Sequence, residues 1–272
     1  QPQIYYLEYK DDLTKTGGKE DEFVTILENL PKEHGFCAKP THMSMTMGAW
    51  LVDIDLNNRT NETRFTKQAK RLTSDKHYDP EECADSLAEA LQREATSIES
   101  WALKMVRPGL VVEELFSHHE DRSLPPHEFC LFVIWGKVYV GQWNEVGDDR
   151  YLAGFFYRDG RAAPGCPVSQ LPDWVPWTEL VRIAERLSEH KDMFRVDMFV
   201  GVPRYSQMNA ELQIVVSESE IHPTTMFCNP FIAEEMARLW VAGYQVGHYV
   251  TIRNEEVPSS FFTKREIGRA HV

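Results

Sequence analysis

The sequence lacks several features that would define a function class at once. No apolar run approaches the ~20 residues that a membrane-spanning helix needs, so we expect no membrane span. The five cysteines form no CxxC pair, which argues against zinc and favours buried thiols in a reducing, cytoplasmic compartment. Acidic residues outnumber basic ones by 42 to 29, giving a formal charge of −13, which excludes a general nucleic-acid binder.

Hydrophobic periodicity in the remaining sequence predicts a mixture of strands and helices. Strands are expected at 3–9, 36–39, 48–55, 109–116, 129–134, 137–143, 151–158, 194–200 and 210–217, with a hairpin turn at Trp135-Gly136. Helices are expected at 22–30, 80–105, 173–190 and 230–242, with a polar connection at 57–75 and loops at 118–126 and 161–172. Neither an internal repeat nor a parallel Rossmann pattern is present. The sequence therefore predicts an α+β class, with antiparallel sheets flanked by helices.

Charged residues alternate along two of these strands. Arg195 and Asp197 are two residues apart and share one face of a strand, as do Glu218 and Glu220 on the next. If the strands pair, three carboxylates and one guanidinium converge. Close carboxylates repel unless a cation lies among them, and hard oxygen ligands suit Mg²⁺ when phosphates complete its shell. The alternative is a solvated strand face with an ordinary Arg–Asp ion pair.

These residues also carry a family resemblance. The order R-V-D at 195–197, then E-x-E-x-x-P at 218–223, resembles the metal-binding end of ATP-grasp ligases. Further segments resemble, in the same order, those of the TupA-like ATP-grasp family of cell-surface polysaccharide biosynthesis. They are Phe36–His42, Glu99–Leu115, Phe129–Val138 and Trp174–Asp197.

The resemblance implies roles for individual residues. Lys39 would bind ATP phosphates, with His42 and Ser44 in the same nucleotide-binding stretch. Glu113 or Glu114, at the strand end before Leu115 in the adenine hinge, would meet the adenine amine or the ribose hydroxyls. Arg195 would be catalytic, stabilising the charge of an acyl-phosphate transition state. Asp197, Glu218 and Glu220 would hold Mg²⁺, with Glu220 standing where most relatives have asparagine.

Three departures from the family pattern are visible. The glycine-rich loop after the lysine is replaced by His42–Gly48, in which only Gly48 easily supplies a positive φ. The lysine of a D-Y-K motif appears as Cys130, and the glycine after the last proline as Thr224. These changes leave open an alternative to an active enzyme: a catalytically degenerate nucleotide-binding or scaffold protein with the same fold.

As a whole, the resemblance implies an ATP-grasp fold, in which two α+β subdomains with antiparallel sheets sandwich ATP. We expect a remnant of an N-terminal region at 1–21, a lid subdomain at 22–116 and a catalytic subdomain at 117–266. Residues 267–272 resemble a translated sequencing-library adapter, and a non-native tail is expected there. The implied activity is ATP- and Mg²⁺-dependent carboxylate–amine ligation through an acyl phosphate. The second substrate would be a small molecule, glycan or peptide from surface polysaccharide or peptide biosynthesis.

Two other constellations have simpler interpretations. His118 and His119, followed by Glu120 and Asp121, include metal-ligating types, but adjacent histidines do not easily chelate one ion, and a polar loop tip is the favoured interpretation. The seven tryptophans would suit carbohydrate stacking, but those on helix faces are expected in the core. A polysaccharide-binding module would need exposed tryptophans along a groove.

Overall fold

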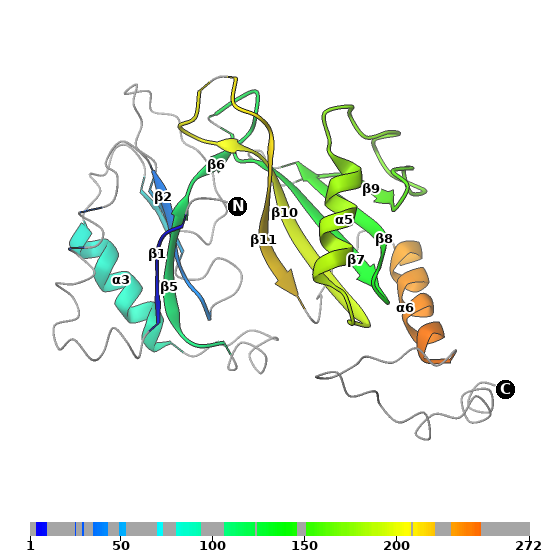
Figure 1. Ribbon diagram of the computed structural model, residues 1–272, viewed down its shortest axis with the longest axis horizontal. Coiled ribbons are helices and arrows are strands. Elements are labelled where there is room, and N and C mark those ends of the chain that lie inside the picture. Colours follow the sequence, from blue (N-terminus) through cyan, green and yellow to red (C-terminus); the bar gives the residue numbers. More distant parts are fainter. Residues whose placement is uncertain are drawn as a thin grey trace. The chain divides into compact units, whose positions relative to one another are not determined.

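The computed structural model describes residues 4–9, 25, 29, 35–42, 49–52, 70–72, 80–93, 106–122, 124–145, 151–207, 209–220 and 230–245. The chain divides into two compact units (Figure 1). The first comprises Gln1–Pro126 with Gly201–Gln213, and the second His127–Val200 with Ile214–Val272. Both combine sheets of mainly antiparallel strands with helices, so the predicted α+β class is confirmed. Among the described residues, no helix is long and apolar enough to cross a membrane.

The first unit is a five-stranded sheet in the order β1-β5-β2-β3-β4. Its strands are β1 (Ile4–Tyr9), β2 (Phe36–Pro40), β3 (Trp50–Val52), β4 (Lys70–Leu72) and β5 (Gly109–Glu114). All neighbours are antiparallel except β3 and β4, which run parallel. The short β6 (Phe116–Ser117) follows β5 and pairs with Val202 and Pro203.

One helix, α3 (Pro80–Gln92), covers one face of this sheet. Its buried Cys83, Ala84, Leu87 and Leu91 pack against alternate strand residues, among them Phe36 and Val112. Each fully buried side chain of leucine size contributes roughly 1.5–3 kcal/mol. The other face of β2, which carries Cys37 and Lys39, is half-buried. The α3 packing therefore fixes which strand residues remain accessible.

The second unit is built on strands in the order β11-β10-β7-β8-β9. They are β7 (His127–Ile134), β8 (Lys137–Glu145), β9 (Tyr151–Tyr157), β10 (Met193–Pro203) and β11 (Gln213–Glu220). Helix α5 (Trp177–Leu187) packs on β7 and β8 (Figure 1). Ile232 and Met236 of α6 (Pro230–Gln245) pack on Phe132 and Ile134 of β7. Every residue of β7 is buried, consistent with cover on both of its faces.

The predicted hairpin between β7 and β8 forms, and its turn anchors α6. Trp135 and Gly136 have φ values of 52° and 75°, as a two-residue type I′ turn requires. The Trp135 indole donates a 3.1 Å hydrogen bond to the carbonyl of Trp240. A Cβ at Gly243 would lie 1.8 Å from Trp135 Nε1, so glycine permits this close packing. Trp240 and Tyr244 also donate hydrogen bonds to Asp192, at 3.0 and 2.6 Å.

The structure corrects two predicted helices and one connection. The helix expected at 173–190 begins only at Trp177, because Pro172 and Pro176 disfavour helical geometry before them. The helix expected at 80–105 ends at Gln92, and 94–105 lie outside the described residues. Within the polar connection at 57–75, Lys70–Leu72 is a strand. The helix expected at 22–30 falls outside the described residues except for Thr25 and Asn29, which are helical.

Candidate functional site

The acidic strand faces predicted from the sequence meet in the second unit. β10 carries Arg195 and Asp197, β11 carries Glu218 and Glu220, and the two strands are neighbours in the sheet. Carboxylate oxygens of Asp197, Glu218 and Glu220 all lie within 4.8 Å of one another. The pairing of these two strands, which the sequence analysis assumed, is therefore present, and it brings the three carboxylates together.

Arg195 is bound to this cluster through its fork of donors. Its Nε donates to Asp197 Oδ1 at 2.7 Å, and its Nη2 donates to Asp197 Oδ2 at 2.6 Å. The same Nη2 donates to Glu220 Oε1 at 2.5 Å. The guanidinium lies 6.0 Å from the ring centroid of Phe132, which faces Arg195 across the β7–β10 pair. Two-point binding of this kind fixes the orientation of the guanidinium as well as its position.

The charges of this cluster are largely removed from water. The side chains of Arg195, Asp197 and Glu220 are 13%, 6% and 14% exposed, whereas Glu218 is exposed. Burial lowers the pKa of Arg195, but the hydrogen bond and charge of Asp197, together with Cys130 and Glu220, raise that pKa above its ordinary value. Arg195 therefore stays charged beside the three carboxylates.

The donor set fits a hard divalent cation. Mg²⁺ prefers oxygen ligands and is commonly held by one or two carboxylates together with phosphate oxygens. Asp197 and Glu220 supply buried oxygens, and Glu218 supplies an exposed one at the same place. A guanidinium beside such an ion is suited to bind a phosphate or another anionic oxygen. The arrangement is chemically equipped for a metal-dependent reaction of an anionic substrate.

Further polar residues, whose grouping was not predicted from the sequence, continue this face onto β7 and β8. Asn144 Nδ2 donates to Glu128 Oε2 at 3.1 Å and lies 3.7 Å from Cys130 Sγ, while Gln142 donates to Asn144 at 2.6 Å. Cys130 pairs in register with both Asp197 and Gln142. The polar residues Glu128, Gln142 and Asn144 therefore lie next to the carboxylate cluster, with Cys130 between them and Asp197.

Cys130, which the sequence resemblance sets against a lysine, lies beside Asp197 in the register. It is buried, and burial is the main cause that raises its thiol pKa well above the ordinary value. The negative charges of Asp197 and Glu128 raise this pKa further, while Arg195 acts in the opposite direction. Cys130 is therefore a neutral thiol in the folded protein and supplies no cation to the face.

In the first unit, Lys39 and Glu113 form an ion pair between β2 and β5. Their side chains are 34% and 22% exposed, so both remain accessible from the half-buried sheet face. Cys37 lies directly opposite Glu113 in the register and is half-buried on the same face. The sequence assigned Lys39 and Glu113 to the nucleotide separately and did not anticipate that they pair.

The other predicted nucleotide-binding residues differ in accessibility. Glu114 is half-buried, whereas Leu115 is buried and its carbonyl accepts a 2.9 Å hydrogen bond from the Arg204 amide. His42 is buried, with Nε2 3.1 Å from the carbonyl of Arg93, just after the end of α3. Ser44 lies outside the described residues. The structure thus gives His42 a structural contact, and its role toward a nucleotide stays a prediction.

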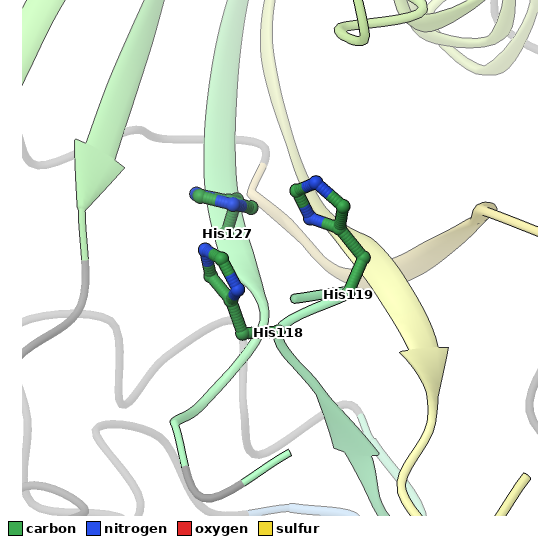
Figure 2. Close-up of side chains that lie close together, drawn as sticks. All are labelled: His118, His119 and His127. Atoms are coloured by element: carbon green, nitrogen blue, oxygen red, sulfur yellow. The ribbon is translucent and has the colours of Figure 1, made fainter. Parts of the chain in front are cut away.

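His118 and His119 lie at the loop where a polar tip was expected (Figure 2). Their rings stack with centroids 4.8 Å apart. His118 Nδ1 accepts hydrogen bonds from the amides of Glu120 and Asp121, at 3.1 and 3.3 Å. Burial, and then the neighbouring His119, lower the pKa of His118. This neutral ring holds the turn together.

His127, which also appears in Figure 2, opens β7 in the second unit. Its buried ring packs 4.4 Å from Trp174 and 5.8 Å from Trp143, measured between centroids. Trp143 also stacks on Phe129, and Trp177 packs against Phe156. Trp143 and Trp177 are buried. Trp177 belongs to the core beneath α5, as predicted, whereas Trp174 precedes the helix and is half-buried, and Trp101 lies outside the described residues.

Comparison with known proteins finds similarity to solved structures only. No family model and no curated protein matches the chain. Solved structures that are similar to it include the D-cycloserine synthetase DcsG, with TM-score 0.39 and 12% identity, and the ATP-grasp ligase PsnB complexed with minimal precursor, with TM-score 0.29 and 11% identity. Each alignment covers 88% of this chain, which spans 65% and 55% of those two chains. Likeness of this degree carries no argument about activity.

Proposed function

We propose that this chain is the nucleotide-binding and catalytic part of an ATP-grasp ligase, which joins a carboxylate to an amine at the expense of ATP. The observation that carries the proposal is the convergence of Arg195, Asp197, Glu218 and Glu220 on two adjacent strands. On an ordinary solvated strand face, three carboxylates this close together would only repel one another. In a metal–phosphate site, the bound cation offsets this repulsion.

In this proposal each residue has a defined task. Asp197, Glu218 and Glu220 would hold Mg²⁺, which when bound neutralises phosphate charge. Arg195 would bind the anionic oxygens that develop charge during transfer. Lys39 would bind phosphate in the first unit, and Glu113, Glu114 and Leu115 would contact the nucleoside, with His42 and Ser44 in the adjoining stretch. In this proposal the first unit would contain the predicted lid subdomain, and the second unit most of the catalytic subdomain.

The reaction would proceed in two balanced steps. A substrate carboxylate oxygen attacks the γ-phosphorus of ATP, and ADP leaves with the electron pair of the broken P–O bond. The amine then attacks the carbonyl carbon of the acyl phosphate, phosphate leaves, and the nitrogen loses a proton. The resemblance to the TupA-like family extends the proposal to substrates of surface polysaccharide or peptide biosynthesis.

The alternative is a degenerate protein that binds nucleotide without turnover. The specific observation in its favour is Cys130, a buried neutral thiol where the family pattern has a phosphate-binding cation. Single-turnover assays with radiolabelled ATP and a panel of amino acids would separate the two. Binding without formation of any acyl-transfer product would support the degenerate protein.

The first test is calorimetric titration with a non-hydrolysable ATP analogue, with and without Mg²⁺. We expect Mg²⁺-dependent binding by the wild type and its loss, by at least about 100-fold, in an Asp197→Asn, Glu218→Gln double variant. Asp159→Asn, Glu234→Gln is the matched control, since it removes two exposed carboxylates of the same unit outside the cluster. Absence of binding by correctly folded wild-type protein would sink the proposal.

A further inference from the structure

The position of Arg195 raises a question about how a metal ion enters the cluster. Its guanidinium already donates to both oxygens of Asp197 and to Oε1 of Glu220, at 2.5–2.7 Å. These are two of the three carboxylates that could coordinate an ion. The resting site therefore contains a cation, and that cation is part of the protein.

This internal cation matters because the carboxylates are buried. Asp197 and Glu220 are 6% and 14% exposed, and a buried carboxylate is unstable without a partner charge. A divalent ion coordinated by Asp197 would lie within a few ångström of the guanidinium, and like charges at that distance repel strongly in a water-poor site. Metal and guanidinium therefore compete for the same oxygens.

The guanidinium has another suitable partner once it leaves the carboxylates. Arginine binds phosphate through the same two-point geometry that it uses for carboxylate. The Phe132 ring, 6.0 Å away, offers the guanidinium an apolar surface along which to move. A ligand that supplies phosphate oxygens would remove Arg195 from Asp197 and Glu220 while leaving these carboxylates to the metal.

We propose that Arg195 fills the cation position of the resting site, so that a divalent ion binds tightly only together with a nucleoside triphosphate that takes over the guanidinium. The inference rests on the proposed function for the identity of the anion, and it adds how the site is regulated. Metal and nucleotide then raise each other's affinity by the same factor, because binding coupling is reciprocal. Free metal alone leaves the site in its resting state.

The test is a titration of Mn²⁺, followed by its electron paramagnetic resonance signal, into wild type and an Arg195→Met variant without nucleotide. We expect the variant to bind Mn²⁺ about 5–150-fold more tightly, the usual range of coupling between sites. Arg182→Met is the matched control. It removes the same charge from an exposed ion pair with Glu179, and we expect its Mn²⁺ affinity to stay within about twofold of wild type.

Two further measurements keep the test independent of whether Arg195→Met folds well. Arg195→Lys keeps the charge but loses the fork of donors, so its Mn²⁺ affinity should lie between those of wild type and Arg195→Met. In the wild type, a non-hydrolysable ATP analogue should raise the Mn²⁺ affinity by a similar factor. It should produce little further gain in Arg195→Met, where the competing group is already gone.

The outcomes separate this inference from the proposed function. If folded Arg195→Met and Arg195→Lys bind Mn²⁺ no more tightly than wild type, the inference is overturned even though nucleotide binding persists. If both variants gain Mn²⁺ affinity but the wild type binds no nucleotide, competition between Arg195 and the metal stands and the proposed function falls.

Discussion

At the scale of single residues, Cys130 shows how neighbours decide the chemistry of a side chain. The thiol is buried beside Asp197 and Glu128, and burial and both negative charges raise its pKa. Thiolate, the form that reacts with alkylating agents, is therefore scarcer at Cys130 than in an unfolded chain at every pH below the raised value.

We therefore predict that Cys130 resists iodoacetamide in the folded protein. At pH 8.5, labelling followed by peptide mass spectrometry should show Cys130 modified at least about 100-fold more slowly than the same residue in urea. Cys166, which is half-buried in the loop before α5, serves as the internal control for reagent access. Equal labelling of the two cysteines in folded protein would contradict the raised pKa.

The candidate site could be predicted in part, because side chains alternate between the two faces of a strand and the sequence spacing shows which residues share a face. The two-residue spacing of Arg195 and Asp197, and of Glu218 and Glu220, places each pair on one face whatever the fold. The approach of Glu128 to Asn144 could not be predicted, because it depends on the register between β7 and β8. Each of these residues alone looks like an ordinary exposed polar position.

At the scale of elements, Glu185 links α5 to the sheet beneath it. Its carboxylate accepts hydrogen bonds from Arg158 Nε at 2.7 Å, from Lys137 Nζ at 3.3 Å and from the Val138 amide at 3.2 Å. The Glu185 side chain is only 15% exposed. The hydrogen bond from Arg158 is the main cause of its lowered pKa; burial opposes it, and Val138 and Lys137 assist.

We predict that Glu185→Ala lowers the free energy of unfolding by about 1–2 kcal/mol at pH 7, measured by urea denaturation. Glu179→Ala on the same helix, which removes an exposed i,i+3 pair with Arg182, should cost clearly less. Because the folded pKa of Glu185 is lowered, its contribution is fully present above the unfolded value of about 4.3 and disappears as the pH falls through the lowered value. A difference between Glu185→Ala and wild type that persisted unchanged in strong acid would refute this account.

The elements themselves were predictable where local signals agreed. Pro80 begins α3, and Trp135-Gly136 forms the turn between β7 and β8, as expected. The end of α3 was not predictable, because the apolar stripe continues in the sequence. The carbonyl of Arg93, just after the helix, accepts a hydrogen bond from His42. His42 is distant in the sequence, so no local pattern predicts this contact. Strand β4 was not predicted, because Lys70-Arg71-Leu72 is too short to show an alternation of apolar and polar residues.

At the scale of the whole molecule, the charge of −13 opposes the approach of any polyanion. A nucleoside triphosphate without metal carries several negative charges and must approach against this field. Ions in solution screen it, with a Debye length that falls from about 30 Å at 0.01 M salt to about 8 Å at 0.15 M. The proposed nucleotide-binding residues would act only over shorter distances.

We therefore predict that the association rate of a metal-free fluorescent ATP analogue rises about 2–10-fold between 0.01 and 0.15 M salt, measured by stopped flow. Uncharged adenosine carrying the same fluorophore is the control, and its rate should not change with salt. A rate that fell as salt increased would mean that local cations, rather than the net charge, steer the nucleotide.

The division of the chain into units has a consequence for how such a site could be inherited. β10 carries Asp197 and β11 carries Glu218 and Glu220, yet residues 201–213, which include the end of β10 and the start of β11, belong to the first unit. No single uninterrupted stretch of gene therefore encodes the second unit alone. A recombination breakpoint within residues 201–213 would therefore separate the strand of Arg195 and Asp197 from the strand of Glu218 and Glu220.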